Sequence, residues 1–289
     1  MTATAPQTSA AAPARPAATP RAARFGDLLA AEWLKLWSLR SMRWTFGLTA
    51  LGLVALNANA ALADYQNWPH YDPRIKAVFV PEWSYNDTFT NNAGLVLMLI
   101  MGSVGAITVV GEYGTGLIRT TFAAVPARRS VMAAKAIVLT GVTLVYGAVA
   151  STASFAVSQA ILSGRHLGLP FDYPGAWRGL VASALLAPVC ALVGLGLGAL
   201  IRHSATTMVT SAVVLLLLPN MVSEDRRWSA AISHALPVRA WQRLSELDGA
   251  GGLPHVPYPA TVGGAWAVYV LWPLVAVTVA LVVVDRRDV

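Results

Sequence analysis

The sequence predicts an all-α integral membrane protein, with six transmembrane helices preceded by an interfacial N-terminal helix and with both termini in the cytoplasm. Composition gives the first indication, because 56% of the 289 residues are hydrophobic, only 12% are charged and the mean hydropathy is +0.56. Water-soluble domains rarely have this balance. The second indication is a set of apolar runs long enough, at about 1.5 Å of rise per residue, to cross a hydrocarbon core of roughly 30 Å. These runs cover residues 44–63, 92–110, 136–162, 180–201, 205–222 and 262–284.

The chain before the first apolar run divides into two parts. Residues 1–24 are mainly Ala, Pro and Thr with a few Arg, and they lack a signal-peptide core, so we expect a disordered cytoplasmic tail. Residues 25–43 contain many helix formers and no proline, which predicts an interfacial helix. The apolar residues on one side of its helical wheel are Phe25, Leu29, Trp33, Leu36 and Trp37. Glu32 and Arg40 lie at the margin of this side. The alternative for residues 25–43 is a soluble amphipathic helix packed on a partner. Residues 44–289 are predicted to form the six-span domain.

Both ends of the chain are predicted to face the cytoplasm. An even number of spans places them on one side, and Lys and Arg near span ends favour the cytoplasmic side. The segments on that side contain most of the 21 Lys and Arg residues but a minority of the 14 Asp and Glu residues. The net charge of +7 therefore reflects membrane orientation. We expect no nucleic-acid partner, because the basic residues form no single stripe or arm.

Two segments on the outer side, 64–91 and 223–261, are long enough to have structure of their own. In the second, the stretch RWSAAISHALPVRAWQRLSEL predicts short helices that dip back into the outer leaflet. Inside the spans, some small residues have the four-residue spacing that lets helices pack closely. The two pairs are Gly102 with Ala106 and Gly194 with Gly198.

The sequence has none of the arrangements typical of a membrane enzyme. All five His residues fall in loops or at span ends, HExxH and GxSxG motifs are absent, and the apolar runs contain no Asp, Glu or His. The single cysteine, Cys190, excludes an internal disulfide and a CxxC site. We therefore expect no enzymatic activity, no catalytic residue, no metal site and no cofactor in this chain. The missing intramembrane acids also disfavour proton-driven transport.

The polar side chains inside the spans are small or uncharged, and they have two interpretations. They line a path for a transported compound, or they form hydrogen bonds between helices and to their own backbone, and the second interpretation is favoured for any one of them. The candidates for a substrate path are Asn57, Asn59, Ser154, Gln159, Thr207 and Thr210.

The loop between the second and third runs, GEYGTGLIRTTFAAVPARRSVMAAK, has glycines and hydroxyls that suggest a nucleotide-binding loop at first sight. A Walker-type loop needs Lys and then Ser or Thr after its last glycine. Leu117 and Ile118 occupy those positions, so the chain itself is not expected to bind nucleotide. The glycines predict an end to the second span, followed by a short helix over 117–124 that Pro126 ends. This segment is either an ordinary positively charged loop or a docking element.

The segment EWLKLWSLRS before the first run and the loop quoted above resemble the ABC-2 type permease subunits of bacterial ATP-binding-cassette exporters. The shared pattern is Glu-Tyr, then Gly-x-Ile-Arg-Thr-Thr, a Pro-Arg-Arg turn and a Lys at the third span. The similarity in span layout covers residues 25–289. The resemblance implies that 25–43 is a connecting helix, that the loop carries a coupling helix, and that a re-entrant element precedes the last span. The implied coupling residues are Glu112, Tyr113, Gly116, Arg119, Thr120, Thr121, Pro126, Arg128 and Arg129, and those of the connecting helix are Glu32, Trp33, Lys35 and Arg40.

The resemblance also implies a function. It predicts a multi-pass permease of the bacterial cytoplasmic membrane that exports a hydrophobic or amphipathic compound, such as a drug, antibiotic or lipid, and so contributes to multidrug resistance. The fused ATPase domain of larger relatives is not seen in this sequence, and the resemblance therefore leads us to expect ATP and magnesium in a separate ATP-binding-cassette ATPase subunit. The other implied partners are a second permease copy, identical or a sibling, and membrane lipid. The alternatives are a membrane scaffold or sensor that transports nothing and, less favoured, a secondary transporter.

Overall fold

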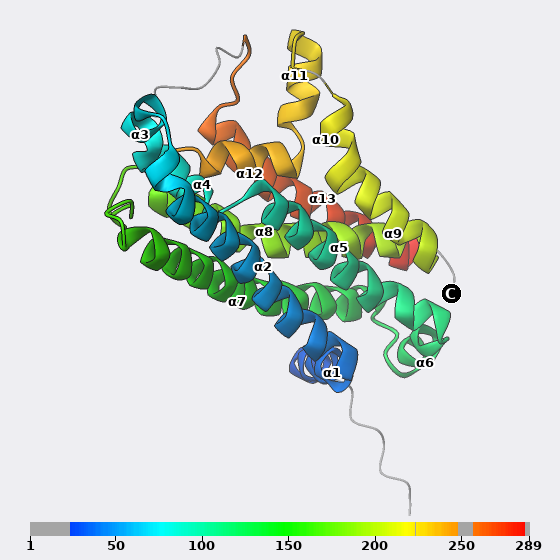
Figure 1. Cartoon of the computed structure of the whole chain (residues 1–289). Helices are drawn as coiled ribbons and strands as arrows, with labels where there is room; N and C mark the ends of the chain where they lie inside the picture. The colour runs from blue at the N-terminus through cyan, green and yellow to red at the C-terminus, as the bar shows by residue number, and fades with distance from the viewer. Residues whose placement is uncertain (1–23, 223, 248–256, 287–289) are drawn as a thin grey trace, which may run out of the picture.

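The computed structural model of the chain describes residues 24–222, 224–247 and 257–286, and their regular structure is helical throughout, without strands. Six helical segments in these residues are long and apolar enough to cross a membrane, which indicates a multi-pass membrane protein (Figure 1). They are α2 (Arg40–Asn67), α5 (Asn91–Gly114), α7 (Arg128–Ser163), α8 (Ala176–Ile201), α9 to α10 (Ser204–Met221) and α13 (Val262–Arg286). The predicted tail, 1–24, lies outside the described residues except for Arg24.

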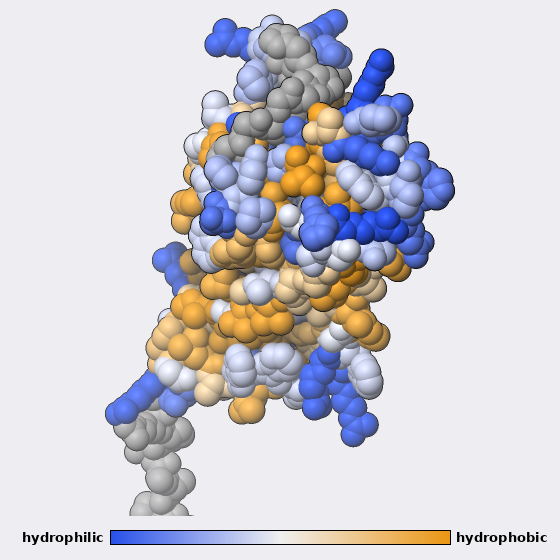
Figure 2. Space-filling model, turned by 60° about the vertical axis from the view of Figure 1, so that its left-hand side comes forward, coloured by the Kyte–Doolittle hydropathy of each residue, from blue (hydrophilic) through white to orange (hydrophobic). Residues whose placement is uncertain are grey.

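The surface of the bundle is apolar where the spans run. Figure 2 shows hydrophobic residues gathered in a band across the molecule, with hydrophilic residues gathered toward its two ends. Many large apolar side chains of the spans are exposed, among them Leu51, Val145 and Val270, at 68%, 65% and 63%. Exposure on this scale is unusual for a water-soluble protein and suits a surface that contacts lipid.

Five of the six predicted apolar runs fall inside these helices, which are longer than the runs, and the run 205–222 is offset by one residue from Ser204–Met221. The largest difference is in α7, which has 36 residues and begins at Arg128, although its apolar run begins at 136. A helix of this length extends about 54 Å, well beyond a hydrocarbon core of about 30 Å. The first two turns of α7 therefore project from the membrane at the end of the bundle that also carries α6 (Leu117–Ala124).

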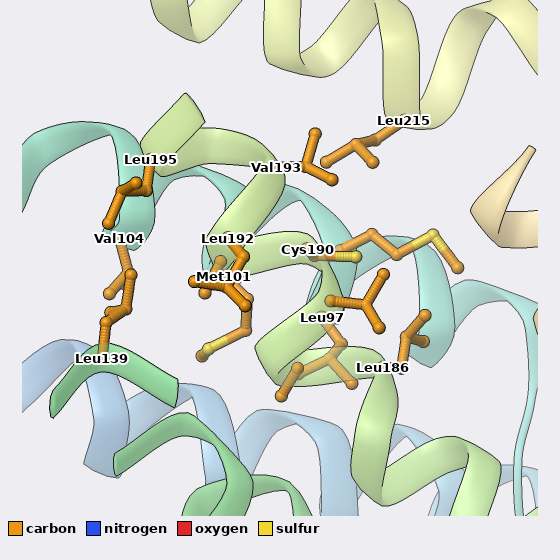
Figure 3. Packing of buried hydrophobic residues seen from close by; sticks show 14 of the residues in the cluster. Leu97, Met101, Val104, Leu139, Leu186, Cys190, Leu192, Val193, Leu195 and Leu215 are labelled. Carbon is orange, nitrogen blue, oxygen red and sulfur yellow. The ribbon is translucent and has the colours of Figure 1, made fainter. Parts of the chain in front are cut away.

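Helix α8 forms the centre of the bundle and packs against α5, α7 and α13. The two predicted pairs of small residues meet here. A Cβ atom added to Gly194 would lie 1.9 Å from the carbonyl oxygen of Gly102, and one added to Gly198 would lie 3.1 Å from that of Ala106. Around this contact the core is filled by Leu, Val and Met side chains from α5, α7 and α8 (Figure 3). The prediction of close helix packing is confirmed.

The N-terminal helix α1 (Phe25–Ser38) ends earlier than predicted, because Leu39 has an extended backbone with ψ of 113°. Arg40 belongs to the first turn of α2. On the predicted apolar side Leu36 is buried and Trp33 is 51% exposed, and Glu32, predicted at the margin of this side, is only 5% exposed. Glu32 points into the protein because charged partners from other helices surround it, as described below.

Short helices occupy the opposite end of the bundle. The segment after α2 contains Trp68–His70, α3 (Pro73–Val78), a π turn (Phe79–Trp83) and α4 (Ser84–Asn86). The short helices predicted before the last span are present as α11 (Arg227–His234) and α12 (Pro237–Ser245). Helix α12 is anchored by Trp241, whose indole nitrogen donates to Ser183 Oγ at 3.0 Å and whose ring lies over Gly94.

Candidate functional site

Four charged side chains from three helices meet at the end of the bundle that carries α1 and α6. Lys35 and Glu32 come from α1, Glu112 from the last turn of α5, and Lys135 from the second turn of α7. Lys35 Nζ contacts Glu32 Oε1 at 2.7 Å and Glu112 Oε1 at 3.0 Å. Lys135 Nζ contacts Glu32 Oε2 at 2.5 Å and Glu112 Oε1 at 2.8 Å. Charges of opposite sign therefore alternate around a closed ring of four residues, called the ion ring below.

The ion ring is largely removed from solvent. Glu32 and Lys135 are each 5% exposed and Glu112 is 8% exposed, whereas the side chain of Lys35 remains 30% exposed. Taking charges out of water costs several kcal/mol per ion, and only mutual pairing with good geometry offsets this cost. Each member contacts two partners of opposite charge and the ring sums to zero, so burial leaves no net charge uncompensated.

Within its own helix, the charge of each ring member would be stabilised only weakly, or destabilised, without the other members. Glu32 and Lys35 are three residues apart on α1, a spacing that favours an ion pair but contributes only a few tenths of a kcal/mol on a free helix. Glu112 lies in the last turn of α5, where the negative end of the helix dipole disfavours a carboxylate. The two ammonium groups at 2.8 and 3.0 Å compensate that repulsion.

The ring also keeps its accessible cation charged. Burial lowers the pKa of Lys35, but hydrogen bonds to Glu32 and Glu112 and the charges of both carboxylates raise it more. The pKa of Lys35 therefore lies above its ordinary value of 10.5. Lys35 therefore stays charged throughout the neutral range of pH.

Helix α6 has the bounds predicted from the sequence, Leu117–Ala124. It begins after Gly116, whose φ of 71° lies in the left-handed region that glycine adopts without strain. Ile118 and Phe122, four residues apart, are buried against the bundle, whereas Arg119 and Thr120 are exposed. This amphipathic helix therefore lies on the end of the bundle, with one face packed against the bundle and the other exposed.

Further contacts hold the chain that follows α6. The guanidinium of Arg128 lies 5.5 Å from the ring centroid of Phe122, and Arg129 Nη2 contacts Asp285 Oδ2 at 2.5 Å. The second contact joins the first turn of α7 to the last turn of α13. On the other flank of α6, Arg202 lies 4.8 Å from the ring centroid of Tyr113. These contacts thus join the helices on either side of the loop, α5 and α7, to Arg202 after α8 and to α13.

The structure separates the predicted coupling residues into two groups. Glu112 and Tyr113 face the interior, and the Glu112 carboxylate is occupied by Lys35 and Lys135, so any part that it has in coupling would be indirect. Exposed on the loop are Arg119, Thr120, Pro126 and Arg129. The hydroxyls of Thr120 and Thr121 donate to the carbonyl of Leu117, at 2.8 and 3.0 Å.

Lys135 is the site residue that reasoning from the sequence missed. It was noted only as the basic residue at the start of the third span. The signal that identifies it is its position, because it directly precedes a long uncharged run on a helix that begins seven residues earlier. A lysine so close to an apolar face needs a carboxylate partner.

Two of the candidate substrate-path residues are joined to each other in the interior. Asn57 Nδ2 donates to Ser154 Oγ at 3.1 Å, and Asn57 Oδ1 accepts from the amide and hydroxyl of Thr90 at 3.1 and 2.8 Å. The Gln159 amide bridges to the segment before α5, donating to Ser84 O and Thr88 Oγ1 at 3.0 and 2.8 Å. These side chains hold helices together, which favours the structural interpretation for them.

The remaining candidates differ in their surroundings. The Thr207 hydroxyl donates to the carbonyl of His203 at 2.8 Å within its own helix. Thr210 is partly exposed on the same helix, and Asn59 is exposed on the outer surface of α2. The six residues therefore do not converge on one internal path within this chain.

No protein-family model and no curated protein matches this chain.

Proposed function

We propose that this chain is the permease subunit of an ABC-2 type ATP-binding-cassette exporter in the bacterial cytoplasmic membrane. Both termini then lie in the cytoplasm, with α1 along the inner membrane surface, and the chain pairs with a second permease copy. A separate ATPase subunit binds ATP and magnesium. The permease moves a hydrophobic or amphipathic compound outward by switching between inward and outward openings.

One observation carries the proposal: α6 has an exposed face, and the end of α5 that precedes it is held by ion pairs to other helices. Arg119 and Thr120 are exposed to the side on which a soluble partner would dock. Behind them, the last turn of α5 is fixed through Glu112 to α1 and α7. A force applied to α6 therefore reaches three helices at once instead of being lost in a flexible loop. An ordinary charged loop needs no such attachment.

The ion ring gives this transmission a specific route. Helix α1 carries no apolar run and is connected to α2 by the break at Leu39, so the ring, together with the buried Leu36, holds α1 in place. A displacement of α5 by the ATPase moves Glu112 and draws Lys35 and Lys135 with it. The proposed coupling is thus a concerted shift of α1, α5 and the start of α7.

Co-purification tests the docking role of α6. A tagged chain is co-expressed with an ATP-binding-cassette ATPase from the same genomic neighbourhood, either unchanged or as Arg119→Glu. Reversing a charge at an interface costs on the order of 2–5 kcal/mol, so we expect the variant to lose the ATPase and its transport activity. The matched control is Arg74→Glu, an exposed arginine at the opposite end of the bundle. If Arg119→Glu retains both properties, α6 is not the dock and a membrane scaffold or sensor becomes the better interpretation.

A further inference from the structure

A cavity of about 270 Å³ lies at the end of the bundle opposite α1 and α6, between the segment around α4 and the end of α12 (Figure 1). Three aromatic side chains line it, namely Tyr85, Phe89 and Trp241. The Tyr85 hydroxyl donates to the carbonyl of Ala176 at 2.8 Å, and the Tyr85 and Phe89 rings meet edge to face with their centroids 5.5 Å apart. Trp241 is held by its hydrogen bond to Ser183. The cavity therefore has an aromatic wall whose rings are fixed in place.

The charged groups that line this cavity are negative. Its lining contains two carboxylates, Glu82 and Glu246, and no Lys, Arg or His. Glu246 Oε2 accepts from Arg243 at 2.7 Å, so its charge is compensated. The side chain of Glu82 is partly exposed and forms no salt bridge or hydrogen bond within the described part of the chain. A carboxylate without a cationic partner, in a cavity walled by aromatic rings, attracts positive charge.

The end of α12 is held in place around the cavity. Arg178 of α8, which does not line the cavity itself, donates through Nη2 to the carbonyl of Glu246, and Gln242 Nε2 donates to Asn91 Oδ1 at 2.8 Å. Among these fixed groups, the Ser245 hydroxyl of the cavity wall has a buried oxygen without a hydrogen-bond partner in the residues that the structure describes. A buried polar atom without a partner is unusual, and a molecule inside the cavity would supply one.

We infer that this cavity binds a small organic cation, with its ammonium group at Glu82 and its apolar part against Phe89 and Trp241. The carboxylate and the faces of the rings both attract the cation, an attraction that a neutral compound of the same shape does not gain. The volume lies just below the range of about 300–1,000 Å³ that is usual for ligand sites, so the ligand is small. This inference does not depend on the ATPase partner or on transport.

The test uses the full chain purified in a non-ionic detergent and isothermal titration calorimetry in a sodium chloride buffer, so that an inorganic cation competes throughout. The probes are benzyltrimethylammonium and N-benzylacetamide, a neutral compound of similar size with the same ring. We expect the unchanged chain to bind the cation roughly tenfold or more tightly than the neutral compound. Glu82→Gln, which keeps the shape of the side chain, should remove this preference. Phe89→Leu should weaken binding of the cation about threefold through the lost ring.

Matched controls make the result specific. Asp172→Asn removes the same charge from an exposed residue at the same end of the bundle, and Phe171→Leu removes an exposed ring that does not line the cavity. Neither control should change binding of the cation. Equal affinity of the unchanged chain for the two probes would overturn the inference, and this comparison needs no variant to fold. So would an equal loss of the preference in Asp172→Asn and Glu82→Gln, because the cation would then respond to the charge of the whole surface.

Discussion

Lys135 is the residue on which the ion ring depends most, because its ammonium contacts both carboxylates and is almost fully buried. Lys135→Met leaves Glu32 and Glu112 sharing the single cation of Lys35. We expect a loss of about 3–5 kcal/mol in the free energy of unfolding, the usual effect of breaking a buried ion pair from one side. The measurement is an unfolding transition of the purified chain in detergent.

A double variant, Lys135→Met with Glu32→Gln, tests whether the ring acts as a unit. It removes one charge of each sign and leaves the contact between Lys35 and Glu112, so its cost should be smaller than the sum of the two single costs by about 0.5–3 kcal/mol. Additive costs would mean that the four residues act independently. Arg129→Ala is the comparison on the surface, where an exposed pair contributes at most about 1 kcal/mol.

The burial of Glu32 could not be predicted from its own neighbourhood, for a physical reason. A helical wheel places Glu32 at the margin of the apolar side, and an isolated carboxylate is not expected to enter an apolar interior. The partner that permits its burial, Lys135, lies 103 residues away in the sequence. No local pattern contains that information. The same holds for Glu112, whose two cationic partners come from α1 and α7.

At the scale of helices, the packing of α5 on α8 is the most constrained contact. Gly194→Ala should destabilise the protein by about 1–3 kcal/mol, because the added Cβ would overlap the carbonyl of Gly102 at 1.9 Å and force the helices apart. Thermal unfolding monitored by circular dichroism in detergent measures the effect. Gly141→Ala on α7 is the control, since its added Cβ meets no atom within 4 Å and alanine favours helix. Similar losses in both variants would contradict the importance of this contact.

The bounds of helix α6 could be predicted from local sequence, whereas its packing could not. Its bounds were predictable because Gly116 and Pro126 act on the backbone of their own neighbourhood, one through a left-handed φ and the other through its missing amide hydrogen. The spans were predictable because their length and apolarity are also local. Which face of α6 packs, and which of its neighbours turn inward, depends on the tertiary arrangement.

At the scale of the whole molecule, the sidedness of the spans is open to a direct test. In a background of Cys190→Ala, which removes the single thiol, Arg74→Cys should react with a membrane-impermeant maleimide added to intact cells. Thr120→Cys should react only after the membrane is opened, because the charge distribution predicts that α6 faces the cytoplasm. The opposite pattern would reverse the orientation and remove the basis for a cytoplasmic ATPase partner.

The glycine contact between α5 and α8 has a mechanical consequence. Where backbone rests directly on backbone, with an added Cβ at Gly105 only 1.8 Å from the carbonyl of Ala191, one helix cannot slide past the other by a turn without collision. The two helices are therefore expected to move as a single rigid lever. A push on α6 would swing this lever as a whole, and any opening of a passage would occur along seams where side chains, rather than main chains, separate the helices.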